Sequence, residues 1–454
     1  MRYRNIFISE TWTNKTIFFI VSILIAELII DISLARSYSY SFTNQFSPNL
    51  RVAIFLTLGI VYIIGQYILL RFTKNKSKDI SSRRQLHLSL IHRSVMIIQY
   101  VLAAVIVFFI VEMVLTSSYN VVVLATAIGI SYTLSIILLV LLSKRFFSWF
   151  KSNRNSVVLL YGLSSAMLAI NAASTLAFVD IVLLSLSPTY VRPHPVGIFV
   201  PFITSGSLTI ILNYMYSVSS VISFMLSWAA TILVLRHYSP KLGKVKVWIV
   251  LGLPLGYFLV QFLPLFPDIV SFVSESDTLL FLYSLIPGYS KVAGAILFGI
   301  AFWTAARNLG HRSKVKEYMI MSAYGLILLF ASNQAILLVD SPYPPFGLVT
   351  TSFMGIASYL VLVGIYSSAI SIAQDSRIRQ YIRRFAEKES GLLDSIGTAQ
   401  MEQEIQQRVI TLTKQNQDKM AQESGVYSSL TEDDVKMYLE QVIREVRKNH
   451  NKKS

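Results

Sequence analysis

The chain has 454 residues, of which 54% are hydrophobic and only 14% are charged, and its formal net charge is +16. Soluble proteins carry about a quarter charged residues, so this deficit indicates burial in lipid, where an ionisable group is costly. The sequence contains no cysteine, which excludes disulfides, thiolate metal sites and cysteine nucleophiles. The six histidines lack the spacing of a metal-binding motif, and we expect neither a metal site nor a cofactor.

Ten long apolar segments run through the chain, and each is long enough to cross ~30 Å of hydrocarbon as a helix. A helix is required because every backbone amide must be hydrogen-bonded internally in lipid. The segments cover residues 16–35, 52–71, 94–115, 120–143, 157–180, 208–235, 247–266, 289–306, 318–339 and 347–372. The pattern predicts an all-α polytopic transmembrane helix bundle of about ten spans over residues 1–372, with a short helical cytoplasmic tail over residues 373–454.

Basic residues gather in every second gap between these segments, six in the second gap and four each in the fourth, sixth and eighth. By the positive-inside rule these gaps face the cytoplasm, which predicts a multi-pass protein of the cell membrane with both termini cytoplasmic. From residue 373 onward there are fourteen basic and thirteen acidic residues, so nearly all of the net charge lies between the spans. There it favours attraction to anionic lipid heads, and we expect no nucleic-acid partner.

Two outer gaps, residues 187–207 and 267–290, mix proline and glycine with aromatic and aliphatic residues. Exposure of so much apolar surface to water is unfavourable, so we expect these gaps to form interfacial caps or short re-entrant pieces on the outer face. In the seventh segment, Pro254 and Pro264 predict a kink that neighbouring helices accommodate.

Acidic residues occur inside or at the end of four odd-numbered spans, at Glu27, Asp31, Glu112, Asp180 and Asp340. These spans run outward, so all five carboxylates belong to the outer half of the membrane or its outer edge. Glu112 and Asp340 fit the membrane edge. Glu27 and Asp31 share one helix face and follow eleven nearly uninterrupted apolar residues. Acids at that depth normally face the bundle interior and mark a polar cavity or a buried partner.

Polar residues also interrupt the ninth segment, at Asn333 and Gln334, and the sixth segment, at Asn213 and Tyr214. Hydrogen bonds between helices account for most such residues. One interpretation is therefore structural, with the two acids of the first span bonded to these side chains or to Asn171. The other interpretation is ligand binding, for which the candidate residues are Glu27, Asp31, Asp180, Asn333 and Gln334.

The tail begins with four arginines at the membrane exit, where each is worth ~1 kcal/mol against anionic lipid. Apolar residues then recur every three to five positions between Leu392 and Leu412, which predicts an amphipathic helix. A final helix is indicated by Thr431 as N-cap, acidic residues in the first turn and basic residues in the last. Its apolar stripe needs a partner surface, which is another copy, a different protein, or the other tail helix in a hairpin. The candidate partner-binding residues are Val435, Leu439, Val442 and Val446.

Three runs of the tail carry a resemblance: SSAISIAQDSRIRQYI, LLDSIGTAQMEQEIQQRV and SLTEDDVKMYLEQVIREV. Over residues 367–448 the chain resembles a group of uncharacterised archaeal polytopic membrane proteins. It is similar there to the multi-span sensor modules of archaeal signalling proteins. The resemblance implies a membrane location and this architecture, and it implies no substrate.

Two functions are consistent with these features. The first is a receptor-like or sensor-like protein, in which an outer-half polar cavity binds a small ligand and the tail engages a partner. The alternative is a transporter or permease for a small solute or cation, which requires a polar path on the inner side. The sequence offers little polarity there beyond Gln66, Gln99 and Arg307. No paired catalytic groups, nucleotide-binding loop or kinase motif is present, so an enzyme is not expected.

Overall fold

The computed structural model describes a large part of the chain, mostly as helix. The described residues are 14–37, 47–81, 86–185, 207–236, 244–260, 262–263, 276–307, 309, 314–339, 343–386, 391–424, 433–435, 437–439, 441–442 and 445. The helices are α1 (Asn14–Ser37), α2 (Pro48–Ser81), α3 (Leu86–Thr116), α4 (Val121–Ser152), α5 (Ser156–Ser185), α6 (Ser207–Leu235), α8 (Lys244–Val260), α10 (Asp277–Arg307), α11 (Lys314–Ser332), the 3-10 helix η5 (Ala335–Leu338), α12 (Leu348–Gln374), α13 (Ser376–Ala386) and α14 (Leu392–Ser424).

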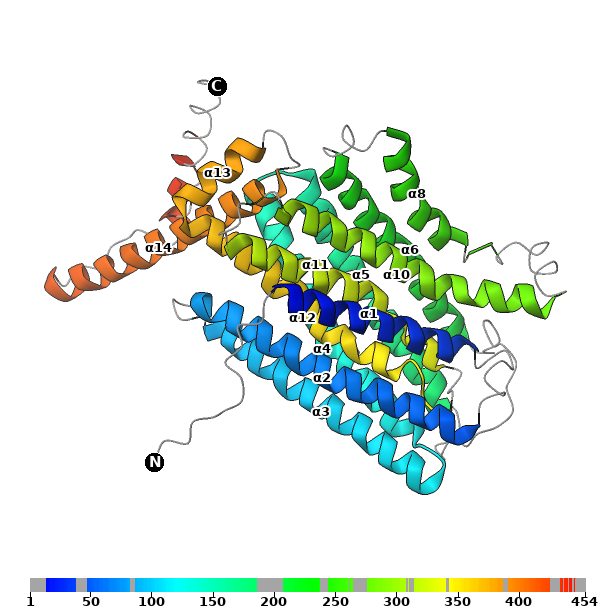
Figure 1. The fold of residues 1–454 in the computed structure, drawn as a ribbon. Coiled ribbons are helices and arrows are strands. Elements are labelled where there is room, and N and C mark those ends of the chain that lie inside the picture. The colour runs from blue at the N-terminus through cyan, green and yellow to red at the C-terminus, as the bar shows by residue number, and fades with distance from the viewer. Residues whose placement is uncertain are drawn as a thin grey trace.

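Nine of the described helices are long and apolar enough to cross a membrane. They lie side by side in one bundle (Figure 1), which confirms the predicted polytopic helical fold. The seventh expected segment is shorter than predicted, because α8 has 17 residues and ends at Val260. Its apolar part, Val247–Val260, falls below the length of the other spans, although α8 packs on both α6 and α10. Pro254 lies inside α8.

The gap that precedes the eighth span is partly helical. Its second half, from Asp277, forms the first turns of α10, which continues to Arg307 as a single 31-residue helix. The expected cap over residues 267–290 is therefore wrong for this half. Residues 264–275 and the other expected cap, 187–206, lie outside the described residues.

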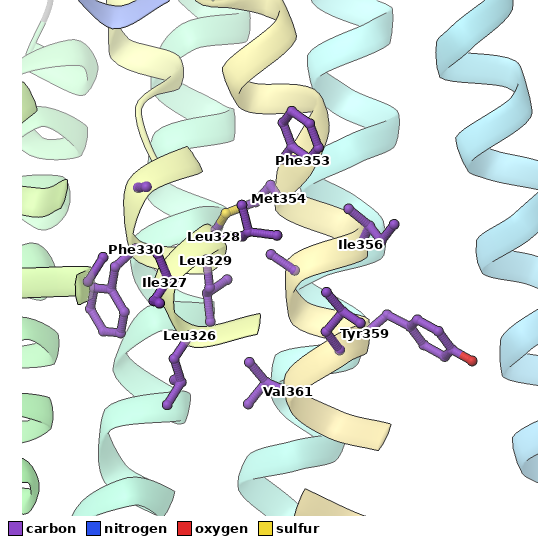
Figure 2. Close-up of a cluster of buried hydrophobic side chains, with 14 of the residues drawn as sticks. Leu326, Ile327, Leu328, Leu329, Phe330, Phe353, Met354, Ile356, Tyr359 and Val361 are labelled. Carbon is purple, nitrogen blue, oxygen red and sulfur yellow. The ribbon is translucent and has the colours of Figure 1, made fainter. Parts of the chain in front are cut away.

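The central helix of the bundle is α12, and it is buried along its whole apolar length. It contacts α11 most extensively and also packs on α1, α2, α3, α4 and α14. In Figure 2, Leu328 and Leu329 of α11 lie near Met354 of α12. Tyr359 points away from this contact toward the next helices, where its hydroxyl lies 2.7 Å from His92 Nδ1.

Glycine allows α11 and α12 to approach closely. A Cβ added to Gly364 would lie 2.7 Å from the Tyr318 carbonyl oxygen and 2.8 Å from the Ser322 nitrogen. On the other helix, a Cβ added to Gly325 would lie 2.7 Å from the Val361 nitrogen. Small residues at such contacts are typical of helix association in membranes, where packing rather than water exclusion holds helices together.

The bundle has the inverse surface of a soluble protein. In the peripheral helix α3 only 28% of the most apolar stretch is buried, whereas in α12 the whole of that stretch is buried. Large apolar side chains such as Phe19 and Leu115 face outward from the bundle. A surface of this kind is stable only against lipid, so the chain is an integral membrane protein.

The tail helices lie at one end of the bundle (Figure 1). The start of α14 is packed against that end, with Leu392, Leu393 and Ile396 buried. The rest of α14 projects away from the bundle and exposes apolar side chains, Leu412 among them.

Candidate functional site

Two groups of buried or half-buried polar side chains lie inside the bundle. The first surrounds the start of α12, and we call it the cap cluster: Glu27, Asp31, Tyr62, Gln99 and Thr350. The second surrounds the interruption between α11 and η5, and we call it the break cluster: Tyr132, Asn171, Tyr216, Lys291 and Asn333. Together they contain three of the five ligand-binding residues predicted from the sequence, Glu27, Asp31 and Asn333, and Gln334 is adjacent to the break cluster.

Asp31 binds the N-terminus of α12. Its Oδ1 accepts a hydrogen bond from the Gly347 amide at 2.9 Å. Its Oδ2 accepts from the amide and the hydroxyl of Thr350, at 2.9 and 2.7 Å. Gly347 has a positive φ of 98° and offers no side-chain cap to the helix it begins. Asp31 of α1 thus caps the N-terminus of α12, a role that a residue next to the helix usually fills. Its negative charge is favourable at the positive end of the helix dipole.

Glu27 lies one turn below Asp31 and differs from it in its contacts. Its side chain is 3% exposed, and neither carboxylate oxygen has a hydrogen-bond partner among the described residues. The nearby Tyr62 hydroxyl instead donates to Gln99 Oε1 at 3.0 Å. Among the described residues, the predicted bonds from these acids are therefore wrong, whether to Asn171, Asn213, Tyr214, Asn333 or Gln334.

The break cluster is organised by Asn333, which lies where α11 stops at Ser332. Its Nδ2 donates to Asn171 Oδ1 at 2.7 Å, and its Oδ1 accepts from the Tyr132 hydroxyl at 3.2 Å. The Tyr132 hydroxyl also accepts the Ala335 amide at 3.1 Å. These side chains replace the helical hydrogen bonds that the break removes, as irregular backbone at membrane depth requires. Nearby, Gln334 Nε2 donates to the Gly288 carbonyl oxygen at 3.2 Å.

A lysine completes the break cluster. Lys291 Nζ donates to the Asn333 carbonyl oxygen at 3.1 Å and to the Tyr216 hydroxyl at 3.2 Å. Its ammonium also lies 5.3 Å from the centre of the Tyr216 ring. Lys291 is only 4% exposed, and ionisable residues buried in this way are usually functional in membrane proteins.

The remaining predicted residues do not join either cluster. Asp180, near the end of α5, has one buried carboxylate oxygen without a hydrogen-bond partner among the described residues. Tyr214 is mostly exposed at the bundle surface, and the residue two positions later, Tyr216, takes part instead. Asp340 lies outside the described residues.

The sequence reasoning missed three members of the break cluster: Tyr132, Tyr216 and Lys291. Lys291 stands two residues from the start of the apolar segment 289–306, where a basic residue is typical of the edge of a span. The helix in fact begins at Asp277, which puts Lys291 fourteen positions inside it. The pair Pro287-Gly288 is typical of a turn, so no clear signal in the sequence indicates that the helix continues through it.

Hydroxyl groups line the contact between α5 and α6 on the side nearer to α14. The hydroxyls of Ser164 and Ser227 are 2.5 Å apart, and Ser164 also donates to the Ser223 carbonyl oxygen. Ser164 and Tyr161 border a cavity of about 10 Å³, roughly the space of one water molecule. Polar groups in this half of the bundle are therefore more numerous than the sequence suggested.

The comparisons add no family to this geometry: no family model, curated protein or solved structure matches the chain. Within the described parts of the chain, no group of three or more histidine, aspartate or glutamate side chains is arranged to hold a metal ion.

Proposed function

We propose that the protein is a receptor-like membrane protein in which a ligand bound in the outer half of the bundle changes the position of the cytoplasmic tail. The observation that carries this proposal is the placement of α12. One end of this buried helix is bound by Asp31, and the other end contacts α14. Its 27 residues span about 40 Å, so a shift at one end reaches the other through a rigid, fully packed element.

The joint between the bundle and α14 supports this coupling because it is specific. Trp149 Nε1 donates to Gln400 Oε1 at 3.1 Å, and Asn155 Nδ2 donates to Ser395 Oγ at 2.9 Å. A Cβ added to Gly397 would lie 2.8 Å from Ile372 Cβ, so α14 approaches the end of α12 closely. A tail held by such contacts responds to small movements of the helices beneath it.

The part of the tail that projects from the bundle is the proposed binding surface for a partner. Ile405, Leu412 and Met420 are exposed along the projecting half of α14. Val435 and Leu439 are half-buried and Val442 is exposed, while Val446 lies outside the described residues. These apolar side chains are suited to a protein partner or a second copy. The resemblance of the tail to archaeal sensor modules agrees with this reading.

We infer that both termini are cytoplasmic and that the protein resides in the cell membrane. This orientation needs α8 to cross as a tenth span. Its apolar part, Val247–Val260, is shorter than a usual span, and Lys244 and Lys246 precede it, as the positive-inside rule expects. Basic residues at this face attract anionic lipid heads.

A solute transporter is the second candidate, because the break cluster suits a substrate site as well as a receptor site. Interrupted helices with buried polar groups near mid-membrane are the usual substrate sites of transporters. The hydroxyl groups of Ser164, Ser223 and Ser227 extend polarity from that cluster toward the α14 side.

A cysteine pair separates the two candidates, because the natural chain contains no cysteine. The double variant Asn155→Cys, Ser395→Cys places its only thiols at the joint of α14. Solutes that raise the thermal stability of the protein are identified first. In a receptor they change the rate of disulfide formation and do not accumulate in proteoliposomes. Two results together would overturn the receptor proposal. The disulfide-locked variant would still accumulate the solute in vesicles, and the solute would not change the rate at which the disulfide forms.

A further inference from the structure

Lys291 is a buried cation that forms no ion pair with an acidic residue in the described part of the chain. The one ion pair within 4.0 Å among the described residues joins Lys76 to Glu317, at the surface. Lys291 instead contacts two neutral oxygens, the Tyr216 hydroxyl and the Asn333 carbonyl. A charge removed from water normally requires an opposite charge nearby, because neutral hydrogen bonds recover only part of its hydration.

The hydrogen-bond count around Lys291 leaves donors in excess. An ammonium has three hydrogens, and two of them point to Tyr216 and Asn333. The Tyr216 hydroxyl accepts from Lys291, so its own hydrogen is available, and no described residue accepts it. Among the described residues, the third ammonium hydrogen of Lys291 and the hydroxyl hydrogen of Tyr216 therefore have no acceptor, and the two donor atoms lie 3.2 Å apart.

We propose that Lys291 and Tyr216 bind the carboxylate of a small monocarboxylate. One carboxylate oxygen accepts from the Lys291 ammonium, and the other accepts from the Tyr216 hydroxyl. The spacing of the donors suits the two oxygens of one carboxylate, and such charge-assisted bonds are the stronger kind. This inference rests on the proposed function and names the ligand class of its outer-half site.

Binding at this site is coupled to movement. Lys291 is buried in the present structure, and α10 packs on α6, which carries Tyr216. A ligand reaches Lys291 only when the outer parts of α6 and α10 separate. Since the same ammonium also donates to the Asn333 carbonyl oxygen at the end of α11, a carboxylate bound to its third hydrogen lies next to the break before α12.

The test measures thermal unfolding of the full-length protein in lipid nanodiscs with the sodium salts of acetate, propionate, butyrate and benzoate. Sodium chloride at the same ionic strength and the neutral methyl esters are the control ligands. A ligand that binds only the folded state raises the unfolding temperature in proportion to its occupancy. We expect at least one carboxylate to do so, and chloride and the esters to have no such effect.

Matched variants locate the binding. Lys291→Met removes the charge, and we expect the carboxylate shift to disappear even though the protein stays folded, because Met fills a similar volume. Tyr216→Phe, which removes one hydroxyl, should weaken the apparent affinity roughly tenfold. Tyr214→Phe, on the same helix but exposed to lipid, should leave the affinity unchanged.

Two results would overturn the carboxylate site: a chloride shift equal to that of every carboxylate, or an unchanged carboxylate shift in both Lys291→Met and Tyr216→Phe. The disulfide rate of the Asn155, Ser395 cysteine pair is recorded with the same ligands. Binding that depends on Lys291 without any change in that rate would refute the receptor proposal and leave the site intact.

Discussion

Asp31 and Thr350 are 319 positions apart in the chain, and a single carboxylate oxygen of Asp31 accepts both the amide and the hydroxyl of Thr350. The other oxygen accepts the amide of Gly347. These bonds satisfy amides at the first turn of α12 that have no partner within the helix. Because α12 is buried from end to end, water is not an alternative partner, and the position of α1 is fixed to that of the central helix.

Replacing Asp31 with leucine should destabilise the protein. Two buried amides lose their acceptor, and each unsatisfied donor costs ~1–3 kcal/mol, so we expect a loss of roughly 3 kcal/mol. Thr350→Val, which removes only the hydroxyl, should cost about 1 kcal/mol. Denaturant titration in detergent micelles measures both. Equal, small losses in the two variants would show that the carboxylate does not cap α12.

Replacing Glu27 with leucine should have the opposite result, although the two acids are one helical turn apart. Glu27 forms no hydrogen bond with a described residue, so its removal relieves a buried polar group and leaves no partner unsatisfied. We expect the free energy of unfolding to stay the same or rise by roughly 1–2 kcal/mol. A loss comparable to that of Asp31→Leu would indicate a partner that holds Glu27.

The contact between α11 and α12 should not tolerate a methyl group. Gly364→Ala places its Cβ against the backbone of α11, at Tyr318 and Ser322, where no side chain can move aside. Overpacking of this kind costs about 1–3 kcal/mol. Gly129→Ala is the matched control, because nothing lies within 4 Å of the added Cβ. Thermal unfolding of the two variants should separate them clearly, and equal stability would contradict the close packing.

Reporter fusions test the orientation and the crossing of α8. Fusions at Asn75 and Ser454 should read as cytoplasmic, and fusions at Ser118 and Ser276 as external, because basic gaps alternate along the chain. If α8 does not cross, the readings at Ser276 and Ser454 exchange sides. The readings at Asn75 and Ser118 stay the same in either case and serve as internal controls.

The helical bundle was predictable because lipid imposes one rule on every span. Apolar length and the alternation of basic gaps locate the helices without knowledge of their contacts. The exception was the seventh segment, where α8 ends at Val260, before the end of the apolar run. Hydropathy gives the length of an apolar segment and does not show at which residue the helix ends.

The site was only partly predictable, because the role of a polar side chain depends on what faces it. Glu27 and Asp31 have the same signature in the sequence, yet one caps α12 and the other has no described partner. Asn333 was identifiable as a polar interruption, whereas Tyr132 and Tyr216 resemble ordinary membrane aromatics. Their hydroxyls acquire a role only when the break in α11 lies beside them.

The most direct test of the coupling through α12 is amide hydrogen exchange in Asp31→Leu, with Glu27→Leu and the natural protein as references. The account predicts faster exchange both at the start of α12, residues 348–352, and at the docked start of α14, residues 392–400, in Asp31→Leu alone. Exchange within α3 should stay at the natural rate, which excludes general loosening. Faster exchange at residues 348–352 with unchanged exchange at residues 392–400 would contradict the account, because the outer end of α12 would then move without affecting the tail.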